Sequence, residues 1–176
     1  MKLYNKTKVA PDILDAVLVA AGRCTKARTT GAVVKVTQGH RACSSGYAKR
    51  ANFVNTWHLR RVRKWKEERV NTDGGYFSIV LPQRFSTWDA LDLAVSFFQV
   101  AIHEWVHIAD FQAMSRGEFR AFDYARAGSR RRKHDTRPEE LRAIDTTDAA
   151  LERGAVSRNQ DAIIALALEI ERVSRG

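Results

Sequence analysis

The most regular apolar pattern in the chain lies in residues 91–110, which read LDLAVSFFQVAIHEWVHIAD. Apolar side chains recur there every three or four positions, a spacing that places them on one face of an α-helix. The members of this face are Leu91, Ala94, Val95, Phe98, Ile102, Trp105 and Ile108. Ser86 and Thr87 are suitable N-cap residues, so the sequence predicts a long central helix from there to about Met114.

The same stretch contains the pattern His-Glu-x-x-His, formed by His103, Glu104 and His107. Residues four apart lie one above the other on a helix, so both imidazoles can bind one tetrahedral Zn²⁺ at about 2.0–2.1 Å. Glu104 lies about 100° around the helix, where its carboxylate can take a proton from a zinc-bound water. The pattern predicts a zinc site with Glu104 as catalytic base. The alternative interpretation is two solvated histidines on a helix face.

A catalytic zinc has three protein ligands, so a third ligand must come from another part of the chain. Asp110 shares the face of the histidines, but seven residues of helix span about 10 Å, so we expect it to orient His107 rather than bind the metal. His134 follows four consecutive cations, which would oppose a nearby dication. The pair Glu139 and Glu140 remains, with His134 as a weaker alternative.

Other elements are predicted around this helix. Pro11 and Asp12 favour the start of an amphipathic helix over residues 13–21, and Gly22 is expected to end it. Strands are predicted at residues 32–37, 52–59 and 76–81, the last after the turn Asp73-Gly74-Gly75. Because it directly precedes the motif helix, the strand at 76–81 is expected to be the edge strand of the active site.

The C-terminal third is predicted to be helical after an exposed connection. Residues 117–133 contain two glycines and many basic residues, with a possible short helix over 119–124. Thr136 is expected to cap a helix with Pro138 and Glu139 in its first turn that ends near Gly154. A last helix is predicted over 159–174.

Length and charge set the broad class. The 176 residues fit one domain, and 30 basic against 20 acidic residues give a formal charge of +10. No apolar run approaches the roughly 20 residues of a membrane span, and Cys24 and Cys43 suggest no disulfide framework, so a cytoplasmic protein is expected. Two basic clusters are either solvated faces or nucleic-acid contacts: Arg60, Arg61, Arg63, Lys64, Lys66 and Arg69, and Arg130, Arg131, Arg132 and Lys133.

Two motifs together resemble the zincin metallopeptidases of the gluzincin branch. They are His-Glu-x-x-His at 103–107 and residues 137–143, which read RPEELRA, and the likeness covers roughly residues 76–150. In gluzincins the third zinc ligand is a glutamate on a later helix, often with a small residue three positions on, which corresponds to Glu140 and Ala143. The resemblance thus implies Glu140 as third ligand, with Glu139 second.

The resemblance also implies a fold and an activity. The fold would be α+β and zincin-like: a small twisted sheet, a backing N-terminal helix, a long motif helix and C-terminal helices that supply the glutamate, all in one domain over residues 1–176. The activity would be zinc-dependent hydrolysis of peptides or proteins, with Glu104 activating water. Ile144 stands where some gluzincins have an acidic residue, and Asp145 follows it. Tyr124 and His134 are the candidates for stabilising an oxyanion.

Two alternatives of other classes remain. The small size resembles minimal gluzincins and zincin-like proteins that phages and other mobile elements often carry, and such a protein could regulate a partner without turnover. A basic nucleic-acid-binding protein, in which the histidine motif is coincidental, is the second alternative. Bound zinc separates the second alternative from the enzyme, and peptide cleavage separates the first.

Overall fold

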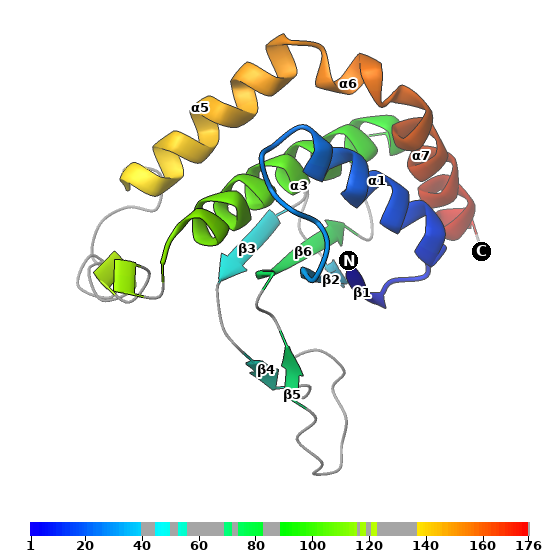
Figure 1. The fold of residues 1–176 in the computed structure, drawn as a ribbon. Coiled ribbons are helices and arrows are strands. Elements are labelled where there is room, and N and C mark those ends of the chain that lie inside the picture. The colour runs from blue at the N-terminus through cyan, green and yellow to red at the C-terminus, as the bar shows by residue number, and fades with distance from the viewer. Residues whose placement is uncertain are drawn as a thin grey trace.

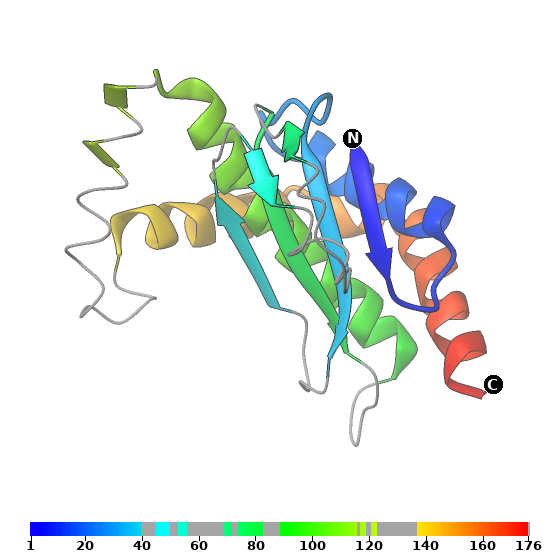
Figure 2. The same cartoon turned by 90° about the horizontal axis from the view of Figure 1, so that it is seen from below.

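The structure is a computed structural model that describes residues 1–39, 45–49, 53–55, 69–71, 74–82, 89–115, 117–118, 121–122 and 137–175. Within these residues the chain has an α+β fold in which the helices lie on one side of a four-stranded sheet (Figures 1 and 2). The predicted α+β class is confirmed. The helices are α1 (Pro11–Arg23), α3 (Ala90–Ala113), α5 (Pro138–Glu152), α6 (Ala155–Arg158) and α7 (Gln160–Arg175).

The sheet has three parallel strands and one antiparallel edge strand. Its order is β1-β2-β6-β3, in which β1, β2 and β6 run parallel and β3 runs antiparallel to β6. A separate antiparallel pair joins β4 to β5. The strands are β1 (Lys2–Lys6), β2 (Val33–Gly39), β3 (Ser45–Lys49), β4 (Phe53–Asn55), β5 (Arg69–Asn71) and β6 (Tyr76–Pro82).

The predicted strands are confirmed in part. The runs at 32–37 and 76–81 form β2 and β6, and β4 lies within the run at 52–59, of which 56–59 fall outside the described residues. The expectation that the strand at 76–81 forms an edge is wrong, because β6 lies between β2 and β3, and the edge strands are β1 and β3. The sequence did not predict β3, because this short strand, which reads SGYAK, carries few strand-forming residues. Without β3, the strand at 76–81 would be an edge.

Helix α1 connects the parallel strands β1 and β2, and its predicted existence is confirmed. The expectation that Gly22 ends this helix is wrong, because α1 continues to Arg23. A Cβ atom at Gly22 would lie 2.6 Å from Thr29 Cγ2 and 3.3 Å from Trp105 Cε2. The space at Gly22 is therefore limited first by the side chain of Thr29 and then by the indole of Trp105 on α3, and the glycine does not end the helix.

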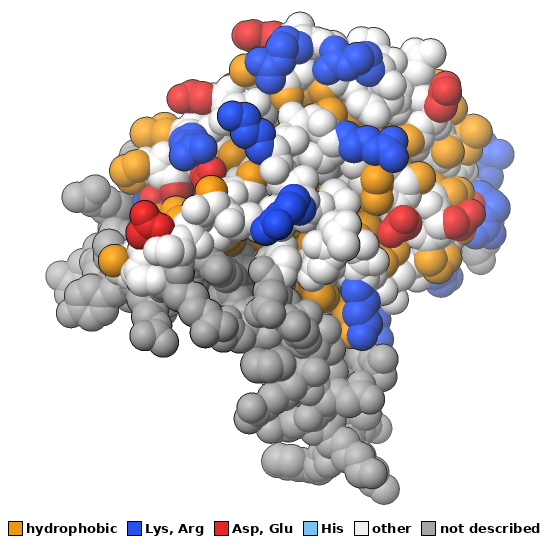
Figure 3. Space-filling view, viewed as in Figure 1, with side chains coloured by type: hydrophobic (Ala, Val, Ile, Leu, Met, Phe, Trp, Pro, Cys, Tyr) orange, Lys and Arg blue, Asp and Glu red, His pale blue; other side chains and the backbone are white. Residues whose placement is uncertain are grey.

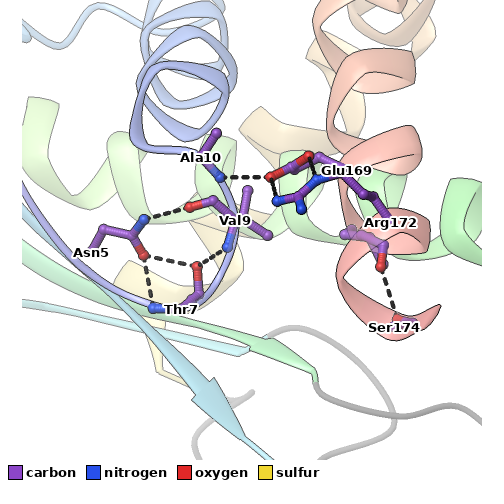
Figure 4. A network of polar contacts seen from close by, with 8 residues as sticks. Asn5, Thr7, Val9, Ala10, Glu169, Arg172 and Ser174 are labelled. Carbon is purple, nitrogen blue, oxygen red and sulfur yellow. Dashed lines mark hydrogen bonds and ion pairs between the residues drawn. The ribbon is translucent and has the colours of Figure 1, made fainter. Parts of the chain in front are cut away.

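A polar network ties the start of α1 to the C-terminal helix α7 (Figure 4). The backbone N–H of Ala10 donates to Glu169 Oε1 at 3.0 Å, and the guanidinium of Arg172 donates to both oxygens of Glu169 at 2.6 and 2.7 Å. On the preceding turn, Asn5 Nδ2 donates to the carbonyl of Val9 at 2.7 Å. These bonds satisfy an N-terminal donor of α1 with a carboxylate from the far end of the chain.

Helix α3 is the centre of the fold and contacts α1, α5, α7, β3 and β6. Asp89 is its N-cap, with Asp89 Oδ1 accepting from the backbone N–H of Asp92 at 2.8 Å. The helix therefore starts after Ser86 and Thr87, the predicted N-cap residues, which lie outside the described residues. The predicted apolar face is largely buried, but Leu91 is 48% exposed. The largest fully buried side chains of α3 are Leu93, Phe97, Phe98, Ile102, Trp105 and Ile108.

The C-terminal helices follow the prediction with shifted ends. Helix α5 begins at Pro138 with Arg137 at the N-cap, so the expectation that Thr136, outside the described residues, caps it directly is wrong by one position. Helix α7 matches the predicted helix at 159–174, and the short α6 before it was not predicted. In the predicted connection, 117–118 and 121–122 are helical. No helix among the described residues is long and apolar enough to cross a membrane.

Candidate metal centre

Helix α3 presents two histidines toward α5. His103 and His107 lie one turn apart, with their ring centroids 4.8 Å apart and their planes at 84°. The side chain of His103 is 21% exposed and that of His107 is 8% exposed. Because other faces of α3 are anchored by large buried side chains, the backbone that carries the two imidazoles is held firmly.

Helix α5 brings a carboxylate to these histidines from across the fold. Pro138 fixes the first turn of α5, and the backbone N–H of Glu140 donates to the carbonyl of Arg137 at 3.0 Å. Glu140 is only 2% exposed. Its Oε2 lies 3.3 Å from His103 Nε2 and 3.2 Å from His107 Nε2. The two imidazole atoms are themselves 3.2 Å apart.

The three side chains His103, His107 and Glu140 form a group that could hold a metal ion. Their ligand atoms make a nearly equilateral triangle with sides of 3.2, 3.2 and 3.3 Å. A tetrahedral ion with bonds of about 2.0–2.1 Å holds its ligand atoms roughly 3.3–3.4 Å apart. The observed separations are close to these values, and two imidazoles with one carboxylate match a donor set of catalytic zinc sites. The residues present therefore fit such an ion.

Two further buried residues of α3 are neighbours of the histidines along the helix. Glu104 is 4% exposed and lies outside the group of three possible ligands. The ring of Phe111 is stacked on that of His107, with centroids 6.4 Å apart and an interplanar angle of 19°. Phe111 is 2% exposed, so this side of the imidazole is covered by an aromatic ring.

Asp110 joins α3 to α5 rather than forming part of the metal group. Arg142 Nη2 donates to Asp110 Oδ1 at 2.9 Å. Burial raises the pKa of the Asp110 carboxyl, while the charges of Arg142 and His107 act in the opposite direction. The structure thus gives Asp110 an ion pair with α5, and the expectation that Asp110 orients His107 stays a prediction.

The predicted site residues divide into three sets. The structure brings His103, His107 and Glu140 together, whereas Glu139 lies outside their group. His134 and Tyr124, the weaker candidates, lie outside the described residues.

Two contributors to the site were not found from the sequence. Phe111 belongs to the predicted helix and lies four positions after His107. Because residues four apart are neighbours on a helix surface, this spacing could have predicted the contact. Arg142 had no such local indication, because its partner lies on another helix.

Of the predicted basic clusters, the structure describes only Arg69, which is the first residue of β5. The other members lie outside the described residues. On the described part of the face in Figure 3, Lys and Arg side chains are spread among Asp and Glu side chains rather than gathered in one patch. This face therefore offers no continuous basic surface over its described part.

No protein-family model, curated protein or solved structure matches this chain. The function must therefore be inferred from the geometry of the metal centre.

Proposed function

We propose that this protein is a zinc-dependent metallopeptidase with a zincin-like fold. The observation that carries the proposal is the convergence of His103 Nε2, His107 Nε2 and Glu140 Oε2 within 3.3 Å of one another. Glu140 lies on a different helix from the histidines, 37 positions after His103 and 33 after His107. Two imidazoles and a carboxylate leave one position of a tetrahedral ion open for a substrate or water.

The chemistry follows from these residues. His103, His107 and Glu140 would hold the ion, and a zinc bound there would supply polarisation of a carbonyl group and acidification of bound water to a pKa of about 7. Glu104 is the next residue after His103 and is 4% exposed. Its carboxylate can accept a proton from the attacking water and deliver it to the leaving amine. Glu140 would supply the third ligand atom, because its Oε2 lies 3.3 Å from His103 Nε2 and 3.2 Å from His107 Nε2.

The sheet supports the same proposal. β3 is the antiparallel edge strand and packs against α3, the helix that carries both histidines. Within the described sheet, β3 pairs with β6 on one side only. An extended peptide can bind such an edge by backbone hydrogen bonds. A substrate bound there would lie alongside the motif helix.

Zinc content and peptide cleavage test the proposal together. We expect the purified full-length chain to bind about one zinc per chain, as expected for one three-ligand centre. Glu104→Gln should keep the zinc and lose cleavage of a mixed library of quenched fluorescent peptides. His103→Ala should lose the zinc, as measured by metal analysis after dialysis. A wild-type chain that binds no zinc would rule out the proposed enzyme.

The third ligand can be tested with a matched pair of variants at adjacent positions. Glu140→Ala should weaken zinc binding by more than the roughly 10–100-fold that loss of an outer-sphere partner costs. Glu139→Ala removes the same charge one residue earlier and should leave the zinc affinity close to that of the wild type. The reverse result, with Glu139→Ala as the damaging change, would contradict the assignment of Glu140.

Zinc binding without cleavage of any peptide would instead favour a regulator that uses the same fold without turnover. Nucleic-acid binding by the basic clusters has its own signature, because such affinity falls steeply with salt concentration. These outcomes separate the proposed enzyme from both alternatives.

A further inference from the structure

Glu140 stands on a helix whose contact with α3 is made by small side chains. The buried residues of α5 are Glu140, Ala143, Thr147 and Ala150. The larger apolar residues Leu141 and Ile144 point outward and are 48% and 38% exposed. Small side chains allow two helices to approach closely, but they interdigitate little. The packing of α5 on α3 therefore does not by itself define the rotation of α5 about its axis.

The carboxylate of Glu140 is sensitive to that rotation. Its Oε2 lies within 3.3 Å of both imidazole nitrogens, so a small turn of α5 would move it out of the ligand triangle. Bond lengths of about 2.0–2.1 Å to a zinc ion leave little tolerance for such a displacement. A contact that resists rotation of α5 would therefore contribute directly to metal binding.

The ion pair between Asp110 and Arg142 supplies such a contact. Arg142 follows Glu140 by two positions, so the two side chains leave α5 about 200° apart. Both nevertheless reach α3, where Glu140 meets the histidines and Arg142 Nη2 meets Asp110 Oδ1 at 2.9 Å. Contacts that leave a helix on opposite sides and end on the same neighbour oppose its rotation in both directions. Asp110 is 12% exposed and belongs to α3, so this anchor point is well held.

We propose that Asp110 and Arg142 are positioning residues that fix the rotation of α5 and thereby hold Glu140 in the metal-binding geometry. The inference rests on the proposed zinc site but adds residues that touch neither metal nor substrate. It predicts that the affinity for zinc depends on an exposed arginine, whose side chain is 69% exposed in the structure.

Substitution of Arg142 distinguishes a positioning role from a purely electrostatic one, because the two roles change the zinc affinity in opposite directions. Removal of a cation near the site should strengthen the binding of Zn²⁺ if only long-range charge matters. Loss of the positioning contact should weaken it. For Arg142→Met, which keeps most of the apolar stem, we expect about 10-fold weaker zinc binding, the lower end of the range for outer-sphere partners. The measurement is competition with a chromophoric zinc chelator.

Arg153→Met is the matched control, since Arg153 is an exposed residue at the C-cap of the same helix. It should leave zinc binding unchanged or slightly stronger. In an Asp110→Asn background, Arg142→Met should cause no further loss, because the contact is already broken. The visible spectrum of the Co²⁺-substituted protein gives a second measurement. It should change from intense four-coordinate bands in the wild type to weaker bands in Arg142→Met if Glu140 leaves the ion.

The results distinguish failure of this inference from failure of the metal site. If the wild type binds zinc and His103→Ala abolishes it, the site stands. The positioning role is then overturned if Arg142→Met binds zinc as tightly as Arg153→Met or if its Co²⁺ spectrum is unchanged. If the wild type binds no zinc, the proposed function fails first. Arg142→Lys, which keeps the charge, should recover part of the affinity and serves as the test if Arg142→Met folds poorly.

Discussion

The two sides of the metal centre are built differently. Helix α3, which carries His103 and His107, runs through the middle of the fold, and its largest side chains are fully buried. Helix α5, which carries Glu140, lies on the outside of α3 and buries mainly alanine and threonine beside its glutamate (Figure 1). One side of the site is therefore set by a tightly packed core, and the other by a shallow contact.

The contrast indicates where the site is robust and where it is sensitive. Changes in the core around α3 should affect the stability of the whole chain, because they remove large apolar areas from a close-packed interior. Changes between α3 and α5 should lower the metal affinity, and they should cost less unfolding free energy than changes in the core, because little area is buried there. Three predictions test this contrast in decreasing order of expected effect on stability.

Trp105→Ala should have the largest effect on the free energy of unfolding. The indole is fully buried, its Nε1 donates to the carbonyl of Leu18 at 2.8 Å, and it packs edge-on against Phe77 with centroids 5.0 Å apart. We expect a loss of about 3–5 kcal/mol, measured by urea unfolding monitored by circular dichroism. Leu91→Ala, at an exposed position of the same helix, is the control and should change stability by no more than about 0.5 kcal/mol. Similar losses for both variants would contradict the description of α3 as the packed side.

Ala143→Leu should have an intermediate effect on stability and a strong effect on zinc. Ala143 is fully buried on the face of α5 that meets α3, so a larger side chain must push the helices apart. We expect a cost of about 1–3 kcal/mol in unfolding free energy. We also expect at least about 10-fold weaker zinc binding, as for loss of an outer-sphere partner.

Ala149→Leu makes the same substitution at a partly exposed position of α5 and serves as control for Ala143→Leu. It should alter neither quantity appreciably. If Ala143→Leu lowers stability but leaves zinc affinity intact, the shallow contact does not control the site.

Glu169→Gln should have the smallest effect, about 1 kcal/mol at neutral pH, because the amide keeps one acceptor oxygen but loses the negative charge that pairs with Arg172. Hydrogen bonding from Arg172 lowers the pKa of the Glu169 carboxyl, with the backbone N–H of Ala10 contributing in the same direction. A lowered folded-state pKa means that the contribution to stability is present above the ordinary pKa and is lost as the pH falls through the folded-state value. The difference in unfolding free energy between wild type and variant should therefore shrink on acidification.

Glu169→Gln should leave the zinc affinity at neutral pH unchanged, because Glu169 joins α7 to the start of α1 and makes no hydrogen bond or ion pair with α5 in the described residues. A difference in unfolding free energy that is constant from neutral to acidic pH would contradict the assigned cause of its pKa shift. A weaker zinc affinity would contradict the separation of the two sides.

Much of the fold followed from local patterns. The helices α1, α3 and α7 and the strands β2 and β6 each have a clear apolar periodicity over their own residues. β1 and β3 were missed because they are short and have few strand-forming residues, and pairing with β2 and β6 supplies their stability. The edge position was misassigned for a related reason, since strand order depends on contacts between segments far apart in the chain.

For the metal centre, the sequence alone determined that His103 and His107 share one face of a helix, because four positions of an α-helix make nearly one turn. It also reduced the search for a third ligand to a few acidic residues and one histidine. The resemblance to gluzincins favoured Glu140 over Glu139, but only the tertiary structure brings Glu140 to the imidazoles and Arg142 to Asp110. Those contacts depend on how α5 is placed and rotated against α3, and this placement results from packing between distant segments rather than from any local repeat.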